Sequence, residues 1–281
     1  AVQNLRATAQ TAEQAPEFLQ GLGLVVTANN VEAAKEFLSG TGEMYGKLGK
    51  LLKQFRKDEK VEAADSETDA LLAAGGADST ESLFDVRVAE GYYRNLKKAV
   101  RNLEDDMQNG GEPTSVDLKA LRQIKMGVKL RGECAGKECF DFPVETAEGV
   151  KSMRVTLQTE SGGFEGGKAS VKIPLVKLGN IQADLQIEDN QIFCFVSSDS
   201  REGTELLEHS KRELTMRLLD LGVSDAMVYC GPNARMGEYT VNRIPGIDKE
   251  GDVTEPQMGE KPDTAQLLAA SKAVFVHIME I

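Results

Sequence analysis

The chain has 281 residues, 41% of them hydrophobic and 28% charged, with a formal net charge of −12. These values are typical of a globular protein that buries its own core in one or two domains. No dense Lys/Arg cluster stands out, so we expect neither nucleic acid nor an anionic membrane surface as a partner. No apolar run is long enough for a transmembrane helix. Because the N-terminus lacks both Met and a signal-peptide pattern, we expect a piece of a longer protein. The four cysteines are more readily interpreted as buried or free thiols than as a metal site, which indicates a cytoplasmic origin.

The first 130 residues are predicted to be mostly helical. Asn30 is a candidate N-cap for the apolar segment that follows it, and Gly40 and Gly42 interrupt the chain before a second apolar segment. The acidic stretch from Asp58 to Ala77 is predicted to be a loop around one short helix.

The clearest helix has one apolar stripe at spacings of three and four residues, made by Tyr93, Leu96, Val100, Leu103 and Met107. The sequence NGGEP, at 109–113, ends it. A further helix is predicted from Thr114, with Leu118, Leu121, Ile124 or Lys125, and Val128 at helical spacing. We interpret this region as a structural helical bundle.

At about residue 138 the apolar period changes from 3.6 to 2, which predicts strands. The alternating positions are Phe140, Phe142 and Val144, then Met153, Val155 and Leu157, then Val171, Ile173 and Leu175. The hairpin at 178–198 puts apolar residues on one face, Ile181, Ala183, Leu185 and Ile187, and polar residues on the other, Gln182, Asp184, Gln186 and Glu188. This pattern indicates an antiparallel sheet with one face exposed to water. In IFCFV both faces are apolar, so that strand is predicted to be central and covered by a helix.

A helix is predicted directly after the hairpin, with Asp199 as N-cap and Glu202 completing a capping box. Its inward stripe is Leu207, Ser210, Leu214, Leu218 and Leu221, and Gly222 ends it. A strand from Ala226 to Cys230 follows. The fold class is therefore α+β, with a helical region at 1–130 and a mainly antiparallel sheet with a strand-strand-helix-strand module at 131–231. Residues 232–281 are predicted as an irregular excursion and a last helix that packs back through Leu268, Ser271, Phe275 and Ile278.

Few residues predict reaction chemistry. The glycine cluster at 161–168 precedes a strand rather than a helix, so it predicts a flexible connection and not a phosphate loop. Cys134 and Cys139 are close in sequence, but a closed zinc site takes about four Cys or His ligands and the chain has only two His. We therefore interpret the cysteines as buried or free thiols, and expect no metal, cofactor or catalytic residue. A hydrolase that uses Cys230 and His209 is kept as the weakest alternative.

The stretch from Pro174 to Val223 resembles the C-terminal domain of flagellar hook-length control proteins. The resemblance rests on Leu178-Gly179, the alternating IQADLQIE, the turn EDNQ, an apolar second strand and a Leu-rich helix that ends in DLGV. Three residues separate Pro174 from Leu178, whereas two usually separate the corresponding Pro and Leu in the family. The segment from Thr114 to Leu157 is similar to uncharacterised bacterial proteins that carry such a domain.

The resemblance implies a non-enzymatic protein that is exported by the flagellar type III apparatus. It implies that the domain contacts the cytoplasmic part of an export-gate component and switches secretion from hook-type to filament-type substrates. The contact residues would be Pro174, Leu178, Gly179, Ile181 and Ala183, although Ile181 and Ala183 point along the apolar face, which favours a core position for them over contact. The alternative is a structural protein that self-associates and shares the fold.

Overall fold

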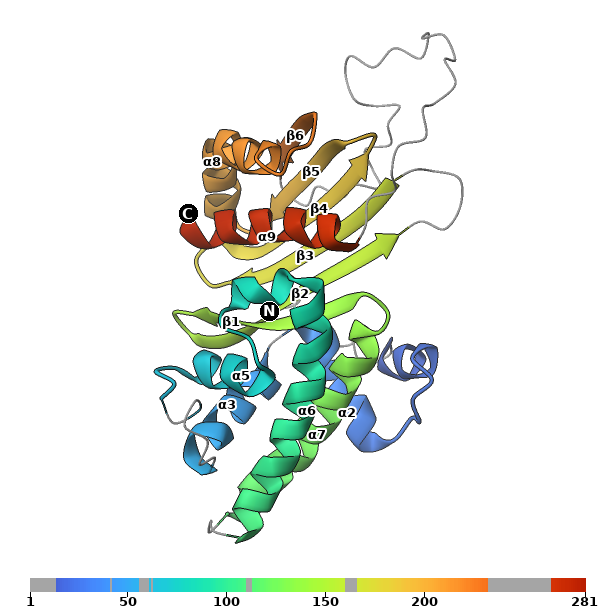
Figure 1. Cartoon of the computed structure of the whole chain (residues 1–281), viewed down its shortest axis with the longest axis vertical. Helices are drawn as coiled ribbons and strands as arrows, with labels where there is room; N and C mark the ends of the chain where they lie inside the picture. Colours follow the sequence, from blue (N-terminus) through green and yellow to red (C-terminus); the bar gives the residue numbers. More distant parts are fainter. Residues whose placement is uncertain are drawn as a thin grey trace. The chain divides into compact units, whose positions relative to one another are not determined.

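The computed structural model describes residues 14–40, 42–55, 61, 63–109, 113–159, 166–231 and 264–281. The chain divides into two compact units, Ala1–Arg154 (unit 1) and Val155–Ile281 (unit 2) (Figure 1). The expected boundary lay at 130/131, whereas the division falls inside a strand further along the chain. The predicted excursion at 232–263 and most of the glycine cluster lie outside the described residues.

The α+β fold class is confirmed, with helices first and then a mixed six-stranded sheet in the order β1-β2-β3-β4-β5-β6. Residues 14–21 are helical. The elements that follow in unit 1 are α2 (Ala28–Ser39), α3 (Glu43–Phe55), α5 (Glu67–Gly75), the 3-10 helix η1 (Thr80–Phe84), α6 (Val86–Asn109), α7 (Ser115–Ala135) and β1 (Cys139–Thr146). Strand β2 (Gly149–Thr159) crosses the boundary between the two units.

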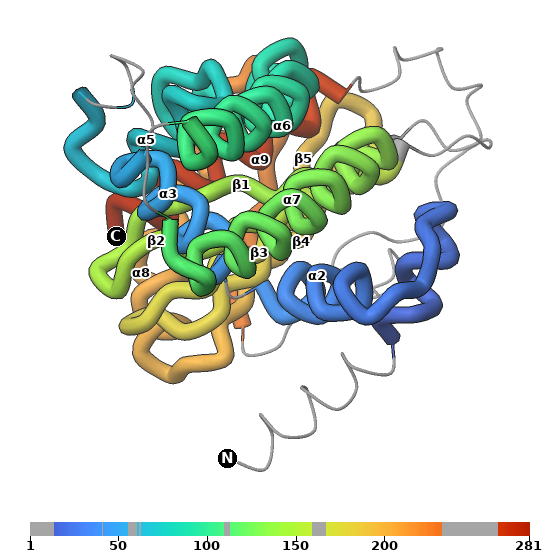
Figure 2. The backbone as a smooth tube through the Cα atoms, turned by 90° about the horizontal axis from the view of Figure 1, so that it is seen from below, coloured from blue at the N-terminus to red at the C-terminus, as the bar shows by residue number. Residues whose placement is uncertain are grey.

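The α6 stripe is confirmed, because all five of its predicted apolar residues are buried. α6 packs along α7, and α2 packs on another side of α7 (Figure 2). Of the two residues considered for one position of the α7 stripe, Ile124 is buried, whereas Lys125 forms an ion pair with Glu104 of α6. Leu118, predicted in the stripe, is 40% exposed.

The N-cap predicted at Asn30 is wrong. The helix begins one turn earlier, and Thr27 is its cap, with a side chain that accepts a hydrogen bond from the Asn30 backbone N–H at 3.3 Å. Asn30 instead donates its side-chain amide to the Val25 carbonyl at 2.6 Å. Gly40 ends the helix with φ +67°, as its conformational freedom predicts.

Unit 2 contains β3 (Gly166–Leu175), β4 (Gly179–Glu188), β5 (Gln191–Ser198), α8 (Arg201–Leu219), β6 (Asp225–Cys230) and α9 (Thr264–Glu280). β4 pairs antiparallel with β3 and β5, and α8 connects β5 to the parallel strand β6. The β4–β5 turn places Asp189 and Asn190 at φ 48° and 60°, as a two-residue type I′ turn requires. The predicted hairpin and central strand are confirmed.

The core of unit 2 lies between the apolar face of its strands and the helices α8 and α9, which contact each other (Figure 1). The alternation predicted for β4 is confirmed, since its four apolar residues are buried and its four polar residues lie on the other face. The predicted stripe of α9 is also buried, so the last helix does pack back. Of the stripe predicted for α8, Leu207, Leu214 and Leu218 are buried and Ser210 is half-buried, whereas Leu221 lies beyond the end of the helix and is exposed.

The capping box predicted at Asp199 is wrong by one residue. Ser200 is the N-cap of α8 and accepts a hydrogen bond from the Gly203 N–H at 2.8 Å. Asp199 is engaged elsewhere, because its carboxylate accepts the Asn180 backbone N–H of β4 at 2.7 Å. The Asp199 carboxylate thus binds Asn180 of β4 and does not cap α8, although the local spacing favoured Asp199 as the cap.

His277 of α9 is buried against α8. Its Nε2 lies 3.0 Å from Ser210 Oγ, and its Nδ1 is buried without a partner among the described residues. Burial lowers the pKa of His277 below its ordinary value, although the carboxylates of Glu213 and Glu280 act in the opposite direction. The helix therefore packs best with a neutral imidazole.

This burial predicts a loss of stability in mild acid. Below the unfolded-state pKa of about 6.5 the unfolded chain binds a proton that folded His277 resists, so the free energy of unfolding falls as pH decreases through that value. Urea unfolding at pH 7.5 and 5.5 measures the effect. His277→Gln keeps a donor toward Ser210 but does not titrate, and it should show a smaller pH dependence; an equal dependence in both proteins contradicts the prediction.

Candidate functional site

The predicted contact residues cluster only in part, at the turn between β3 and β4. Pro174 lies at the end of β3, and Leu178 and Gly179 lie where β4 begins; all three are half-buried. Between them Val176 is 53% exposed. We call residues 174–179 the β3–β4 turn.

Ile181 and Ala183 do not belong to this surface. They are 1% and 0% exposed and face the core of unit 2. Of the two roles considered for them from the sequence, the structure gives them the core position. They support the strand that carries the turn, and their side chains are not available to a partner.

The β3–β4 turn is held by hydrogen bonds from the segment that leads into α8. The Leu178 carbonyl accepts from the hydroxyls of Ser198 and Ser200, the latter at 3.1 Å. The Asn180 side-chain amide also donates to Asp199, at 2.6 Å. A Cβ at Gly203 would overlap the Leu178 carbonyl, so glycine is needed there for the helix to approach the turn. These contacts make a rigid platform that presents Val176.

Gly179 has a conformation that other residues rarely adopt. Its φ is +75°, and a Cβ there would overlap Asp199 Oδ1 and crowd Ser200. The glycine of the Leu-Gly pair that carries the resemblance is therefore a structural requirement of this turn.

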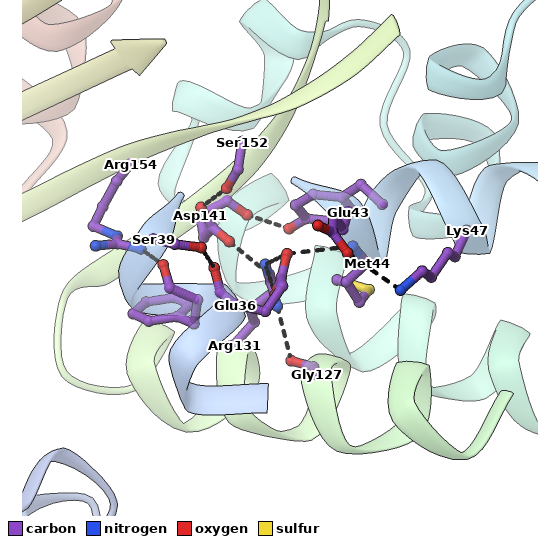
Figure 3. A network of polar contacts seen from close by, with 12 residues as sticks. Glu36, Ser39, Glu43, Met44, Lys47, Gly127, Arg131, Asp141, Ser152 and Arg154 are labelled. Atoms are coloured by element: carbon purple, nitrogen blue, oxygen red, sulfur yellow. Dashed lines mark hydrogen bonds and ion pairs between the residues drawn. The ribbon is translucent and has the colours of Figure 1, made fainter. Parts of the chain in front are cut away.

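A second polar centre, in unit 1, was not predicted from the sequence (Figure 3). Arg131 of α7 is fully buried, and its Nε donates to Asp141 Oδ2 of β1 at 2.5 Å. Its Nη2 donates to Glu36 Oε2 of α2 at 2.9 Å. Burial opposes the Arg131 charge, but the Asp141 and Glu36 carboxylates outweigh it and raise the pKa of Arg131 well above its usual range.

Asp141 connects this centre to further elements. The hydroxyls of Tyr45 and Tyr93 donate to its carbonyl, the latter at 2.7 Å, and the Ser152 hydroxyl donates to its carboxylate. Burial raises the pKa of both tyrosines well above their usual range, so they stay protonated donors. The signal in the sequence was a charged residue inside each apolar pattern, Arg131 in the α7 stripe and Asp141 between two Phe.

A small pocket lies beside this centre. It has a volume of about 160 Å³ and is lined by Asn29, Glu32, Ala33, Glu36, Glu43, Met44, Lys47, Gln123, Ile124 and Gly127. Its three carboxylates are already paired, Glu32 with Lys35, Glu36 with Arg131 and Glu43 with Lys47. Ligand pockets usually have volumes of about 300 Å³ or more. We therefore interpret the Arg131 centre as structural.

The residues considered for catalysis are poorly placed for it. Burial raises the pKa of the Cys134 and Cys230 thiols to about 12, whereas a nucleophilic cysteine needs a lowered pKa. The Cys230 thiol donates to the Leu207 carbonyl, and exposed His209 has Nδ1 2.6 Å from the Glu205 carbonyl. Within the described ranges no three His, Cys, Asp or Glu side chains are grouped to hold a metal. None of the described helices is long and apolar enough to cross a membrane.

Comparisons of the chain with protein-family models, with curated proteins and with solved structures found no match.

Gly179→Ala should destabilise the protein by about 1–3 kcal/mol, because Ala disfavours the positive φ and its methyl group overlaps Asp199. Gly46→Ala in α3 is the matched control, since nothing lies near its added methyl group, and it should gain up to about 1 kcal/mol. Urea unfolding followed by circular dichroism measures both changes. Equal effects of the two substitutions would show that the turn is not constrained.

Arg131→Met should cost about 3–5 kcal/mol of unfolding free energy, because it leaves Asp141 buried without its counter-charge. The double variant Arg131→Met/Asp141→Asn should recover part of this loss, since the uncompensated charge is removed. The same unfolding experiment tests the pair. A double variant no more stable than the single one would contradict the compensation.

Proposed function

We propose that this chain is a non-enzymatic, hook-length-control-like protein whose unit 2 binds the cytoplasmic domain of a flagellar type III export gate. By this contact it would regulate the switch of exported substrates, acting in the cytoplasm and leaving through the same apparatus. The observation that carries the proposal is the β3–β4 turn: the segment for which the resemblance implies contact is rigidly held and presents an exposed apolar side chain.

Preorganisation supports binding at this turn. Ordering a loop upon association costs free energy, and a turn already fixed by Ser198 and Ser200 avoids most of that cost. Val176 is exposed, and burying it against a partner would contribute about 1.5 kcal/mol or more. Such a contact needs shape and apolar surface, and no reactive group.

The structure changes which residues are assigned to this contact. Pro174, Leu178 and Gly179 remain in the proposed site, and Val176 joins them as its most exposed apolar member. Ile181 and Ala183 act only from the core, by fixing the strand behind the turn. The polar face of β4, where Gln182 donates to Asp184, is a neighbouring surface.

Val176→Ser should weaken binding to the purified cytoplasmic domain of the export gate about tenfold, as the loss of one buried apolar side chain predicts. Calorimetry at moderate salt measures the affinity. Met216→Ser is the matched control, because Met216 of α8 is 54% exposed and far from the turn in sequence, and it should bind as the unsubstituted protein does. No binding at about 100 μM protein, or an equal loss in both variants, would rule out the turn as the contact.

A further inference from the structure

The sheet has two outer edges, and they differ in how their backbone groups are satisfied. At the β1 edge the Asp141 N–H donates to the Tyr93 hydroxyl at 2.8 Å, and the Asp141 carbonyl accepts from Tyr45 and Tyr93. The Pro143 carbonyl accepts from the Thr80 hydroxyl at 3.1 Å, and proline has no N–H to leave unpaired. Side chains thus block this edge against a further strand.

The opposite edge is β6, the last strand of the sheet (Figure 1). It pairs in parallel with β5, and the Gly231 N–H donates to the Val196 carbonyl at 3.1 Å. Because the backbone groups of successive strand residues point to opposite sides, the alternate residues 227 and 229 also bond to β5. The residues whose N–H and carbonyl groups point outward are Ala226, Val228 and Cys230.

The outer edge of β6 is open. The Ala226 N–H has only a local acceptor, the Asp225 carboxylate at 2.8 Å. Within the described part of the chain, the outward N–H and carbonyl groups of Val228 and Cys230 form no hydrogen bond. The strand also has neither the lysine nor the proline with which exposed edges are usually protected. Such an edge is a template on which another strand can pair.

We infer that β6 pairs antiparallel with β6 of a second copy of this chain, which gives a dimer with two-fold symmetry. The edge is complementary to itself when Val228 lies opposite Val228 of the second copy. Ala226 then lies opposite Cys230 of the second copy, so every outward residue belongs to a hydrogen-bonded pair. In this register the Ala226 N–H exchanges the Asp225 carboxylate for the Cys230 carbonyl of the second copy, and the carboxylate is released.

The side chains of β6 fit the same register. Cys230 faces α8, since its thiol donates to the Leu207 carbonyl, so Asp225, Met227 and Tyr229 lie on the other face of the strand. Met227 lies opposite Tyr229 of the second copy, and a thioether and an aromatic ring attract each other. Both side chains are half-buried in one copy, so pairing would cover more of their apolar surface.

Charge favours a second copy over an unrelated strand. The Lys211 ammonium of α8 lies 6.0 Å from the centre of the Tyr229 ring, which is on the face opposite α8, so this side chain passes beside the outer edge. Asp225 is exposed and lies four residues before Tyr229, about 13 Å away at about 3.3 Å per residue, which is too far for an ion pair with Lys211 in one copy. In the dimer, Asp225 lies diagonal to Tyr229 of the second copy and within reach of that copy's Lys211.

The nearest acidic group to Lys211 does not prevent this pairing. Glu208 lies 3.7 Å from the Lys211 ammonium, which is a long contact, and both side chains are partly exposed. The Glu208 carboxylate also lies beside the Cys230 thiol, where it helps to raise the pKa of that thiol. It is therefore on the α8 face of the strand, whereas Asp225 of the second copy approaches on the other face.

The test is the mass of the full chain by analytical ultracentrifugation over a range of concentrations, with a charge swap. Lys211→Glu should weaken dimerisation about tenfold, because both symmetric ion pairs become repulsions, and Asp225→Lys should do the same. The double variant Asp225→Lys/Lys211→Glu restores the pairs with exchanged signs, and it should dimerise like the unsubstituted protein. Lys119→Glu, the reversal of an exposed charge on α7 of unit 1, is the control and should have no effect.

Hydrogen exchange of backbone amides locates the interface. The amides of Val228 and Cys230 should exchange quickly in dilute protein and slowly at concentrations where the dimer forms. A chain that stays monomeric at about 1 mM, a dimer that leaves these amides unprotected, or a double variant that does not recover would overturn the inference. So would protection that is independent of concentration, because another part of the same chain would then pair with β6, or protection that requires a different protein.

This test and the export-gate titration can fail independently, because none of these substitutions lies in the β3–β4 turn.

Discussion

The buried ion pair between Arg131 and Asp141 is the interaction on which unit 1 depends. Moving either charge out of water costs several kcal/mol, and the pair offsets this cost only when its remaining donors and acceptors are satisfied. Here Glu36 accepts from Arg131 and Ser152 donates to the Asp141 carboxylate, while Tyr45 and Tyr93 donate to the backbone carbonyl of Asp141. Each comes from a different element, so α2, α3, α6, α7, β1 and β2 must all be in place at once.

In unit 2, hydrogen bonds from a neighbouring segment likewise fix the β3–β4 turn. The Leu178 carbonyl, which no strand partner would satisfy in a turn, accepts two serine hydroxyls from the approach to α8. Asp199 gives up the cap position to bind Asn180, and Ser200 caps the helix instead. Two glycines allow the backbones to come this close. The result is a turn whose geometry is set by the helix behind it.

Sequence reasoning succeeded where one periodic signal dominated. The stripe of α6, the alternation in β4 and the stripe of α9 are each repeated over several residues, and burial of apolar side chains enforces them. It failed where the hydrogen-bond or ion-pair partner of a residue lies far away in the sequence. Asp199 was a good local cap but was taken by a residue 19 positions away. Arg131 and Asp141 were not predicted to be important, because the pairing that explains them forms only when helix and strand pack. Ile181 and Ala183 matched the resemblance, yet periodicity had already placed them on the apolar face.

The β3–β4 turn separates stability from recognition within a few residues. Gly179 and the Leu178 carbonyl fix its geometry through their close approach to Asp199, Ser198 and Ser200. The Val176 side chain is exposed and is not one of these contacts. A substitution at Val176 can therefore change binding while leaving the fold intact, whereas changes at Arg131 or Gly179 act on the fold first.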